Sequence, residues 1–169
     1  MKIAIAAAIA VTAIVSAYGF GQYKSQSIYT EIQIDAPADI VWAELADTSE
    51  HANWNPFIKE FKGEIRKGNQ LDVTIQPPNG SAMRFRPIVL VAADNEELRW
   101  VGHLGFKGVF DGEHYFKLEE QADGTTLFRH GETFTGMFAD LFFVFLEEDT
   151  TRGFKAMNVA LKKRAEANS

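Results

Sequence analysis

The strongest constraint on the fold is a change of hydrophobic spacing near residue 136. Before that point, short segments are separated by turn-forming residues such as Pro77-Pro78-Asn79-Gly80 and Ala122-Asp123-Gly124, which is typical of antiparallel strands. After it, mostly apolar residues recur every three or four positions, as on one face of an amphipathic helix. These residues are Phe143, Leu146, Thr150, Phe154, Met157 and Leu161. The pattern predicts a strand meander followed by a long helix over residues 137–166.

The region before residue 57 predicts one strand and two short helices. Apolar side chains alternate from Ser27 to Asp35, as in a half-buried strand. Asp35-Ala36-Pro37 then supplies helix-start signals, and a second helical piece is expected over residues 49–53. Asn55-Pro56 breaks the chain. Six strand-length segments follow, so we expect a sheet of about seven strands.

The two large apolar faces must cover each other. A sheet and a helix each bury one face, so the last helix is expected to lie on the concave side of the sheet. A chain of 169 residues with 46% hydrophobic content is sufficient for one domain. No linker or repeat follows residue 24. The predicted domain therefore covers residues 25–169 and has an α+β fold with an antiparallel sheet.

Residues 1–24 are set apart by a run without charges from Ile3 to Phe20. At about 1.5 Å per residue this run spans roughly 27 Å as a helix, close to the hydrocarbon thickness of a bilayer. Val15-Ser16-Ala17 also fits a signal peptidase site. The prediction is a single transmembrane anchor that places the domain outside the cytoplasm. The alternative is a signal peptide whose cleavage releases a secreted or periplasmic domain.

Composition excludes several classes of partner and chemistry. The formal net charge of -6 argues against nucleic acid as a partner, because phosphate backbones repel an acidic surface. The chain has no cysteine, so disulfides, thiolate nucleophiles and thiolate metal ligands are ruled out. The motifs GxSxG, HExxH and GxGxxG and the P-loop are missing. We expect no cofactor, and the oligomeric state stays open.

Polar side chains interrupt the apolar face of the last two predicted strands. Strand alternation turns the even-numbered residues inward, and a hairpin at Ala122-Asp123-Gly124 sets His114 opposite His130 or Glu132. Three interpretations follow: a mutually satisfied His–Glu pair, a polar spot that orients a ligand, or a two-His-one-carboxylate metal site. The metal site has the least support, since nothing else in the chain has metal-ligand spacing, and no metal is predicted.

Three stretches of the chain resemble the SRPBCC superfamily. They are APADIVWAELAD at 36–47, WNPF at 54–57 and RGFKAMNVALKKRAE at 152–166. With the order of the elements, residues 27–167 look like the polyketide cyclase/dehydrase-like branch, related to START lipid-transfer domains and birch-pollen allergens. The resemblance implies a helix-grip fold, in which a curved sheet wraps around a long C-terminal helix. It also implies a deep pocket of the kind that the superfamily uses for lipids, sterols, quinones and aromatic polyketides.

The predicted function is to carry or sense a hydrophobic small molecule beside a membrane. The alternative is a cyclase, dehydratase or hydrolase, with His130 as general base and Glu132 or His114 orienting it. A third possibility is an interaction module whose pocket is filled by its own side chains. Trp54 and Phe57 would guard the pocket entrance or close one end of the core. The predicted ligand-binding residues are Trp54, Phe61, Phe85, Trp100, His114, Phe116, Phe128, His130, Glu132, Phe143, Phe154 and Met157.

Two features of the last helix leave alternatives open. Gly153 costs about 1 kcal/mol relative to alanine inside a helix, so it serves either a close approach to the sheet or room for a ligand. The other feature is a second apolar group away from the inward face, made by Phe138, Leu141, Phe142 and Phe145. That group would pack under loops, rest on a bilayer or gate the pocket.

Overall fold

The computed structural model describes residues 25–169. The predictions for residues 1–24 lie outside this range. In chain order the elements are β1 (Gln26–Ile34), α2 (Ala38–Ala46), α3 (His51–Trp54), β2 (Ile58–Lys62), β3 (Asp72–Ile75), β4 (Met83–Phe85), β5 (Ile88–Ala93), β6 (Glu97–His103), β7 (Asp111–Glu120), β8 (Thr126–Thr135) and α4 (Ala139–Ala167). The two short helices between the first two strands are confirmed.

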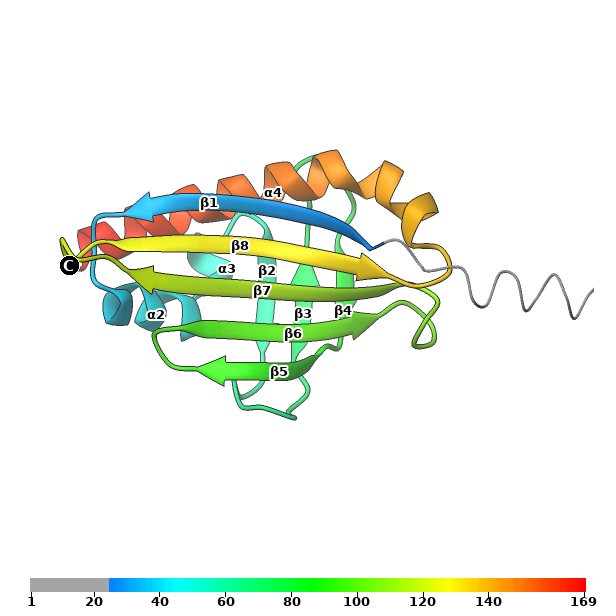
Figure 1. The fold of residues 1–169 in the computed structure, drawn as a ribbon, viewed down its shortest axis with the longest axis horizontal. Helices are drawn as coiled ribbons and strands as arrows, with labels where there is room; N and C mark the ends of the chain where they lie inside the picture. Colours follow the sequence, from blue (N-terminus) through cyan, green and yellow to red (C-terminus); the bar gives the residue numbers. More distant parts are fainter. Residues whose placement is uncertain (1–24) are drawn as a thin grey trace, which may run out of the picture.

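The strands form two antiparallel sheets. The larger has the order β1-β8-β7-β6-β5 and the smaller the order β2-β3-β4. An isolated bridge between Gln70 and Ile88, with neighbouring backbone hydrogen bonds, joins the segment before β3 to β5. Figure 1 shows α4 running lengthwise beside β1, while β2, β3 and β4 cross behind the larger sheet. This arrangement is the predicted helix-grip fold, in which the antiparallel strands wrap around the C-terminal helix.

The structure has one strand more than the sequence pattern predicts. One of the six expected strand-length segments lies between the turn residues Pro77-Pro78-Asn79-Gly80 and Asp94-Asn95-Glu96, but in the structure it divides into β4 and β5. Pro87 lies between them and has no N–H group to donate to a ladder, so the hydrogen-bonded strand ends there. β4 pairs with β3, whereas β5 pairs with β6. The chain therefore passes from the small sheet to the large one at this proline.

The long helix buries the face that its spacing predicts. Thr150, Phe154, Met157 and Leu161 are at most 5% exposed, and Phe143 and Leu146 pack partly buried against the same core. The helix lies mainly on β1, with further contacts to β8 and α2. No helix within residues 25–169 has the length and apolar character needed to cross a membrane.

Gly153 allows a close approach between α4 and the start of β2. A Cβ atom at this position would overlap the Phe57 ring. Phe57 is 1% exposed and also packs edge-on against Phe154, with ring centroids 5.4 Å apart. The close-approach explanation of the glycine is therefore correct, although its partner is Phe57 rather than the large sheet. Phe57 belongs to the core and does not guard an entrance.

A buried histidine and an asparagine hold the turn that contains Phe57. His51 Nε2 donates to the carbonyl oxygen of Leu45 at 2.8 Å, and Asn55 Nδ2 donates to His51 Nδ1 at 3.1 Å. Asn55 Oδ1 accepts from the backbone N–H groups of Phe57 and Ile58, both at 2.9 Å. Burial lowers the pKa of His51 to about 4, so this ring is a neutral structural group.

Candidate functional site

The inward face of β7 and β8 brings the predicted polar residues together. His114 pairs directly with Glu132, and Phe116 pairs with His130. Of the two partners that the hairpin geometry allowed for His114, Glu132 is the correct one. His114 and His130 are buried, at 5% and 0% exposure, and they share the even-numbered face with Phe116 and Phe128. The strand alternation is therefore as predicted.

A continuous chain of hydrogen bonds runs from Glu132 through both histidines to α4 and β1. His114 Nδ1 lies 3.4 Å from Glu132 Oε2, and His114 Nε2 lies 3.0 Å from His130 Nε2. His130 Nδ1 lies 2.8 Å from Asn158 Oδ1. Asn158 Nδ2 donates to Thr30 Oγ1 at 3.0 Å, and this hydroxyl donates to the His130 carbonyl at 3.1 Å. Five side chains are thus joined in one network.

The direction of every bond follows from Thr30. Its single proton goes to the His130 carbonyl, which can only accept, so Thr30 Oγ1 must accept from Asn158. Asn158 Oδ1 then faces His130 Nδ1, which must donate, and a neutral His130 accepts at Nε2. His114 Nε2 is therefore the donor between the two rings. A neutral His114 has no proton on Nδ1, so the proton between this atom and the carboxyl group belongs to Glu132.

Burial favours the same protonation state. It raises the pKa of Glu132 to about 8 and lowers the pKa of His114 to about 3. Burial is also the main reason that the pKa of His130 lies well below its usual value, and the neighbouring His114 ring lowers this pKa further. At pH 7 the network is therefore neutral, with a protonated Glu132 donating to His114 Nδ1.

Aromatic rings hold both imidazoles in place. Phe154 stacks on His130 with ring centroids 3.7 Å apart, and Trp100 stacks on His114 at 4.7 Å. His130 is inaccessible to solvent, because both ring nitrogens are in hydrogen bonds and none of its surface is exposed. This ring has no nitrogen free for a substrate, so the alternative role of His130 as a general base finds no geometric support.

Glu132 differs from the rest of the network because it keeps accessible surface. Its side chain is 18% exposed, although it lies deep enough for burial to raise its pKa to about 8. A deep side chain with accessible surface borders a space that water or a ligand can enter. Its Oε1 atom lies above Gly112 on the neighbouring strand, where a Cβ atom would overlap it. The glycine makes room for the carboxyl group.

The predicted ligand-binding residues fall into two groups in the structure. One group is closed off, at 6% exposure or less: Phe61, Trp100, His114, Phe116, Phe128, His130, Phe154 and Met157. The other keeps accessible surface: Trp54, Phe85, Glu132 and Phe143. Trp54 packs on His51, with ring centroids 4.8 Å apart, and its buried Nε1 has no hydrogen-bond partner within residues 25–169. Ligand contact by either group stays a prediction.

Sequence reasoning missed Thr30, Asn158 and Gly112. Thr30 and Asn158 carried a usable signal, since each is a polar residue at a position that the strand or helix spacing turns inward. Gly112 carried no such signal, because its role depends on Glu132 in the neighbouring strand. Within the described part of the chain, no group of three histidine, aspartate or glutamate side chains is arranged to hold a metal ion.

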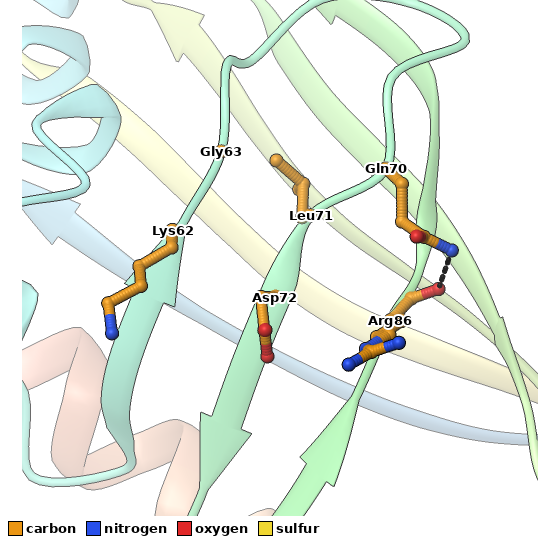
Figure 2. Close-up of a pocket in the computed structure, with 6 residues that line it drawn as sticks. All are labelled: Lys62, Gly63, Gln70, Leu71, Asp72 and Arg86. Carbon is orange, nitrogen blue, oxygen red and sulfur yellow. Dashed lines mark hydrogen bonds between the residues drawn. The ribbon is translucent and has the colours of Figure 1, made fainter.

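A hollow lies on the small sheet, away from the predicted site. It has a volume of about 330 Å³ and is lined by Lys62, Gly63, Gln70, Leu71, Asp72 and Arg86. Figure 2 shows three of these side chains, Lys62, Asp72 and Arg86, as charged groups along its walls. None of its lining residues was predicted to bind a ligand. Charged walls are unlike the mostly apolar lining of a site for a hydrophobic molecule.

Solved structures with the same fold include several enzymes. The Zhui aromatase/cyclase from a Streptomyces species has a TM-score of 0.69 and 16% identity, covering 86% of this chain and 96% of that one. Norcoclaurine synthase from Thalictrum flavum has a TM-score of 0.66 and 16% identity, covering 88% and 99%. A Staphylococcus aureus protein of unknown function, SA2116, has a TM-score of 0.64 and 13% identity, covering 87% and 97%. At these identities the likeness concerns the fold alone.

The family is established by the sequence of almost the whole domain. No curated protein matches the chain. Residues 25–166 match the family model described as "Polyketide cyclase / dehydrase and lipid transport". With the helix-grip fold, this match means that the chain belongs to the polyketide cyclase/dehydrase and lipid-transport family, a branch of the SRPBCC superfamily.

Proposed function

We propose that this protein carries or senses a hydrophobic small molecule whose one polar group bonds to Glu132, and that it catalyses no reaction on that molecule. The observation that carries the proposal is a neutral carboxylic acid that keeps accessible surface, on an inward face whose two imidazoles are buried. Ligand sites in proteins typically combine apolar walls with a few placed polar groups of this kind.

The hydrogen-bond direction defines the polar group of the ligand. The Glu132 proton is used by His114 Nδ1, which lies next to Oε2. The other oxygen, Oε1, is then a carbonyl-type acceptor above Gly112. An acceptor in an apolar space binds a hydroxyl or other neutral donor and disfavours an anion. A phenol or alcohol on a polyketide, sterol or isoprenoid skeleton fits this site better than an ionised fatty acid.

Apolar side chains near this oxygen would bind the body of the ligand. Phe143 is half-buried and lies against Phe134, with ring centroids 5.8 Å apart, and Phe134 follows Glu132 by two residues on the same face. Apolar burial is worth about 25 cal/mol per Å², so a ring-fused or long-chain skeleton would supply most of the affinity. The name of the family, which includes lipid transport, supports the same ligand class.

The second part of the proposal is attachment to a membrane. It rests on the uncharged run from Ile3 to Phe20, whose length as a helix matches a bilayer. A tether of this kind would keep the domain beside a source of hydrophobic ligand. Intact-mass measurement of the protein from its native host decides between anchor and signal peptide, because cleavage after Ala17 would give a chain that starts at Tyr18.

Two variants of Glu132 test the ligand site. In Glu132→Gln the amide N–H₂ can still donate to His114, and the amide oxygen replaces Oε1, so binding should persist. In Glu132→Leu both functions are lost. The full-length chain would be titrated with a dansyl-labelled long-chain alcohol and with the matching dansyl-labelled acid at pH 7. We expect the wild type and Glu132→Gln to prefer the alcohol by about tenfold, which is one hydrogen bond of about 1.4 kcal/mol.

Two results would overturn the carrier proposal or part of it. A full-length protein that is empty by native mass spectrometry and binds neither dansyl probe would reject it. Equal binding of the alcohol by wild type and Glu132→Leu would reject the role of Glu132 and leave the interior as a purely apolar site.

One observation favours an enzyme as a second candidate function. A substrate could give a proton to Glu132 Oε1 while the Oε2 proton moves to His114 Nδ1, leaving an imidazolium whose Nε2–H still donates to His130. The raised pKa of Glu132, about 8, is typical of an acid–base group. This function requires the ionisable acid, so a turnover assay in which Glu132→Gln is inactive would support the enzyme. Retention of activity would exclude this relay.

A further inference from the structure

One end of the molecule exposes a group of large apolar side chains, here called the end patch. Its members are between 40% and 82% exposed: Leu104, Phe106, Met137, Phe138, Leu141, Val144 and Phe145. Phe106 and Phe145 are the most exposed, at 82% and 78%. Single exposed apolar residues are common, whereas a contiguous group indicates a contact surface. Of the alternatives considered from the sequence, packing of the helical part under loops is therefore wrong for Leu141 and Phe145.

The end patch comes from two segments that are bonded to each other. Met137 N donates to the Gly108 carbonyl at 2.9 Å, and Phe138 N donates to the Val109 carbonyl at 3.0 Å. Behind the patch, the rings of Phe110 and Phe142 pack edge-on at 5.3 Å. The β6–β7 loop and the start of α4 therefore form one surface with an aromatic base. Figure 1 shows both segments at the same end of the molecule.

The apolar surface stops after the first turns of α4. At about 100° per residue, the helix positions 138, 141, 144 and 145 project within an arc of roughly 120°. The next residues on the exposed side are Glu147 and Glu148, and the side chain of Glu148 is 86% exposed. The exposed side of α4 therefore changes from apolar to charged along the helix, so only its N-terminal end is suited to contact with lipid.

The described chain begins beside the end patch. Gln26 Nε2 donates to Asp140 Oδ1 in the first turn of α4 at 2.7 Å. Five residues, 21–25, separate Gln26 from the uncharged run that ends at Phe20. Even fully extended, the six steps from Phe20 to Gln26 span at most about 22 Å. A bilayer that contained the uncharged run would therefore lie within that distance of the start of β1, at the same end of the domain as the patch.

We propose that the end patch is a membrane-contact surface that inserts its aromatic and aliphatic side chains into the bilayer interface. This inference rests on the membrane attachment in the proposed function. Aromatic side chains at the headgroup level and an apolar helix face are the usual means of interfacial binding. An uncharged run folded onto the patch in water would leave its own remaining faces exposed, so lipid is the better occupant.

Membrane contact at this end would also define the route of the ligand. Phe142 lies under the patch and packs on Phe110, which stacks on Phe134 with centroids 5.4 Å apart. Phe134 and Glu132 lie on the same face of β8, two residues apart. A row of packed aromatic rings therefore connects the patch to the carboxyl group that we propose binds the ligand, and a ligand that entered from lipid at this end would displace these rings to reach Glu132.

The lack of cysteine in the chain allows a direct test by site-directed spin labelling. Single variants Phe106→Cys and Phe145→Cys place a label on the patch. Val159→Cys is the matched control, because Val159 is 60% exposed on the later part of the same helix. Ala10→Cys reports on the uncharged run. The full-length protein would be reconstituted in phosphatidylcholine nanodiscs, and collisions of each label with oxygen and with a water-soluble nickel chelate would be measured.

The proposal expects oxygen collisions to exceed nickel collisions at residues 106, 145 and 10, with the reverse at residue 159. Nickel accessibility at 106 and 145 equal to that at 159 would overturn it. Low accessibility to both reagents at 106 and 145 would also overturn it, because the patch would then be covered by protein. A lipid-like signal at residue 10 alone rejects only this inference, whereas an aqueous signal at residue 10 rejects the membrane attachment as well.

Discussion

Glu132 and His114 face each other across β7 and β8 with 3.4 Å between Oε2 and Nδ1, and the proton between them belongs to the glutamate. The assignment begins at Thr30, whose hydroxyl must donate to a carbonyl, and passes through Asn158 and His130 to the carboxyl group. The hydrogen-bond directions and the burial of the groups both give a protonated Glu132 and a neutral His114. The buried histidines therefore have defined tautomers.

At pH 7 we expect His130 to carry its proton on Nδ1 and His114 and His51 to carry theirs on Nε2. The His51 assignment follows from its donation to the Leu45 carbonyl. Two-bond ¹⁵N–¹H correlation spectra of the imidazole rings distinguish the tautomers directly. Because burial lowers the pKa of His51 to about 4 and that of His114 to about 3, the three patterns should not change down to pH 5. An imidazolium pattern for His114 at pH 7 would contradict the assignment.

Stability should be greatest near pH 6.5, the usual pKa of histidine in an unfolded chain. Below that pH the unfolded histidines bind protons that the folded ones do not, so stability falls as the pH is lowered towards about 4 and 3. Above it, the folded state alone keeps the Glu132 proton up to its pKa of about 8. Over that range the folded state binds one proton more than the unfolded state, so stability falls as the pH rises and levels off above about pH 8.

The fall on the alkaline side should disappear in Glu132→Gln. Between pH 6.5 and 8 the glutamate contributes a loss of about 2 kcal/mol, at 1.36 kcal/mol for each pH unit. Urea unfolding at four or five pH values measures the free energy of unfolding for both proteins. Below pH 6.5 the variant should lose stability more steeply than the wild type as the pH is lowered, because the wild-type glutamate, whose pKa in an unfolded chain is about 4.3, adds stability in that range. An unchanged alkaline slope in the variant would mean that Glu132 is already ionised at neutral pH.

The fold was predictable because it depends on patterns that a single chain carries. The spacing of Phe154, Met157 and Leu161 identified the long helix, and the turn at Ala122-Asp123-Gly124 left two choices for the register of the last hairpin, one of which is correct. The division of one expected strand at Pro87 was missed. A proline marks a break in a ladder, but it does not reveal that the chain passes from one sheet to another.

The site was predictable only in part. Alternation identified His114, His130 and Glu132 as neighbours, because that inference needs two strands and one turn. The network also needs Asn158 from α4 and Thr30 from β1, which lie 128 residues apart. How these elements dock is fixed by the packing of the whole core, so their contact could not be read from local spacing. The same holds for Gly153 and Phe57.

Removing the Thr30 hydroxyl should weaken the whole network. Thr30→Val keeps the shape but leaves Asn158 Nδ2 without its acceptor and removes the side-chain bond to the His130 carbonyl. One buried unsatisfied group costs about 1–3 kcal/mol, so a loss of this size is expected in the free energy of unfolding. Thr30→Ser retains the hydroxyl and should lose less. A larger loss in Thr30→Ser than in Thr30→Val would show that the methyl group, not the hydrogen bonds, stabilises the site.

Gly153→Ala should destabilise the protein although alanine favours helix by about 1 kcal/mol. The added methyl group would overlap the Phe57 ring, and overpacking of a core typically costs about 1–3 kcal/mol. Phe57→Leu makes the side chain smaller, so the double variant should recover part of the loss. A double-mutant cycle on the free energy of unfolding measures this coupling. An additive cycle would rule out the contact as the reason for the glycine.

Gly112→Ala should displace the Glu132 carboxyl group and reduce ligand binding more than it reduces stability. The methyl group would occupy the position of Oε1, so the side chain must rotate away from the acceptor geometry that we propose for the ligand. Gly102 supplies a matched control, because it pairs with Gly112 in the neighbouring strand and its added Cβ would meet only Pro87 Cβ, at 3.9 Å. Titration with the dansyl alcohol should show weaker binding for Gly112→Ala and wild-type binding for Gly102→Ala. If both variants bind like the wild type, the ligand does not use Glu132 Oε1.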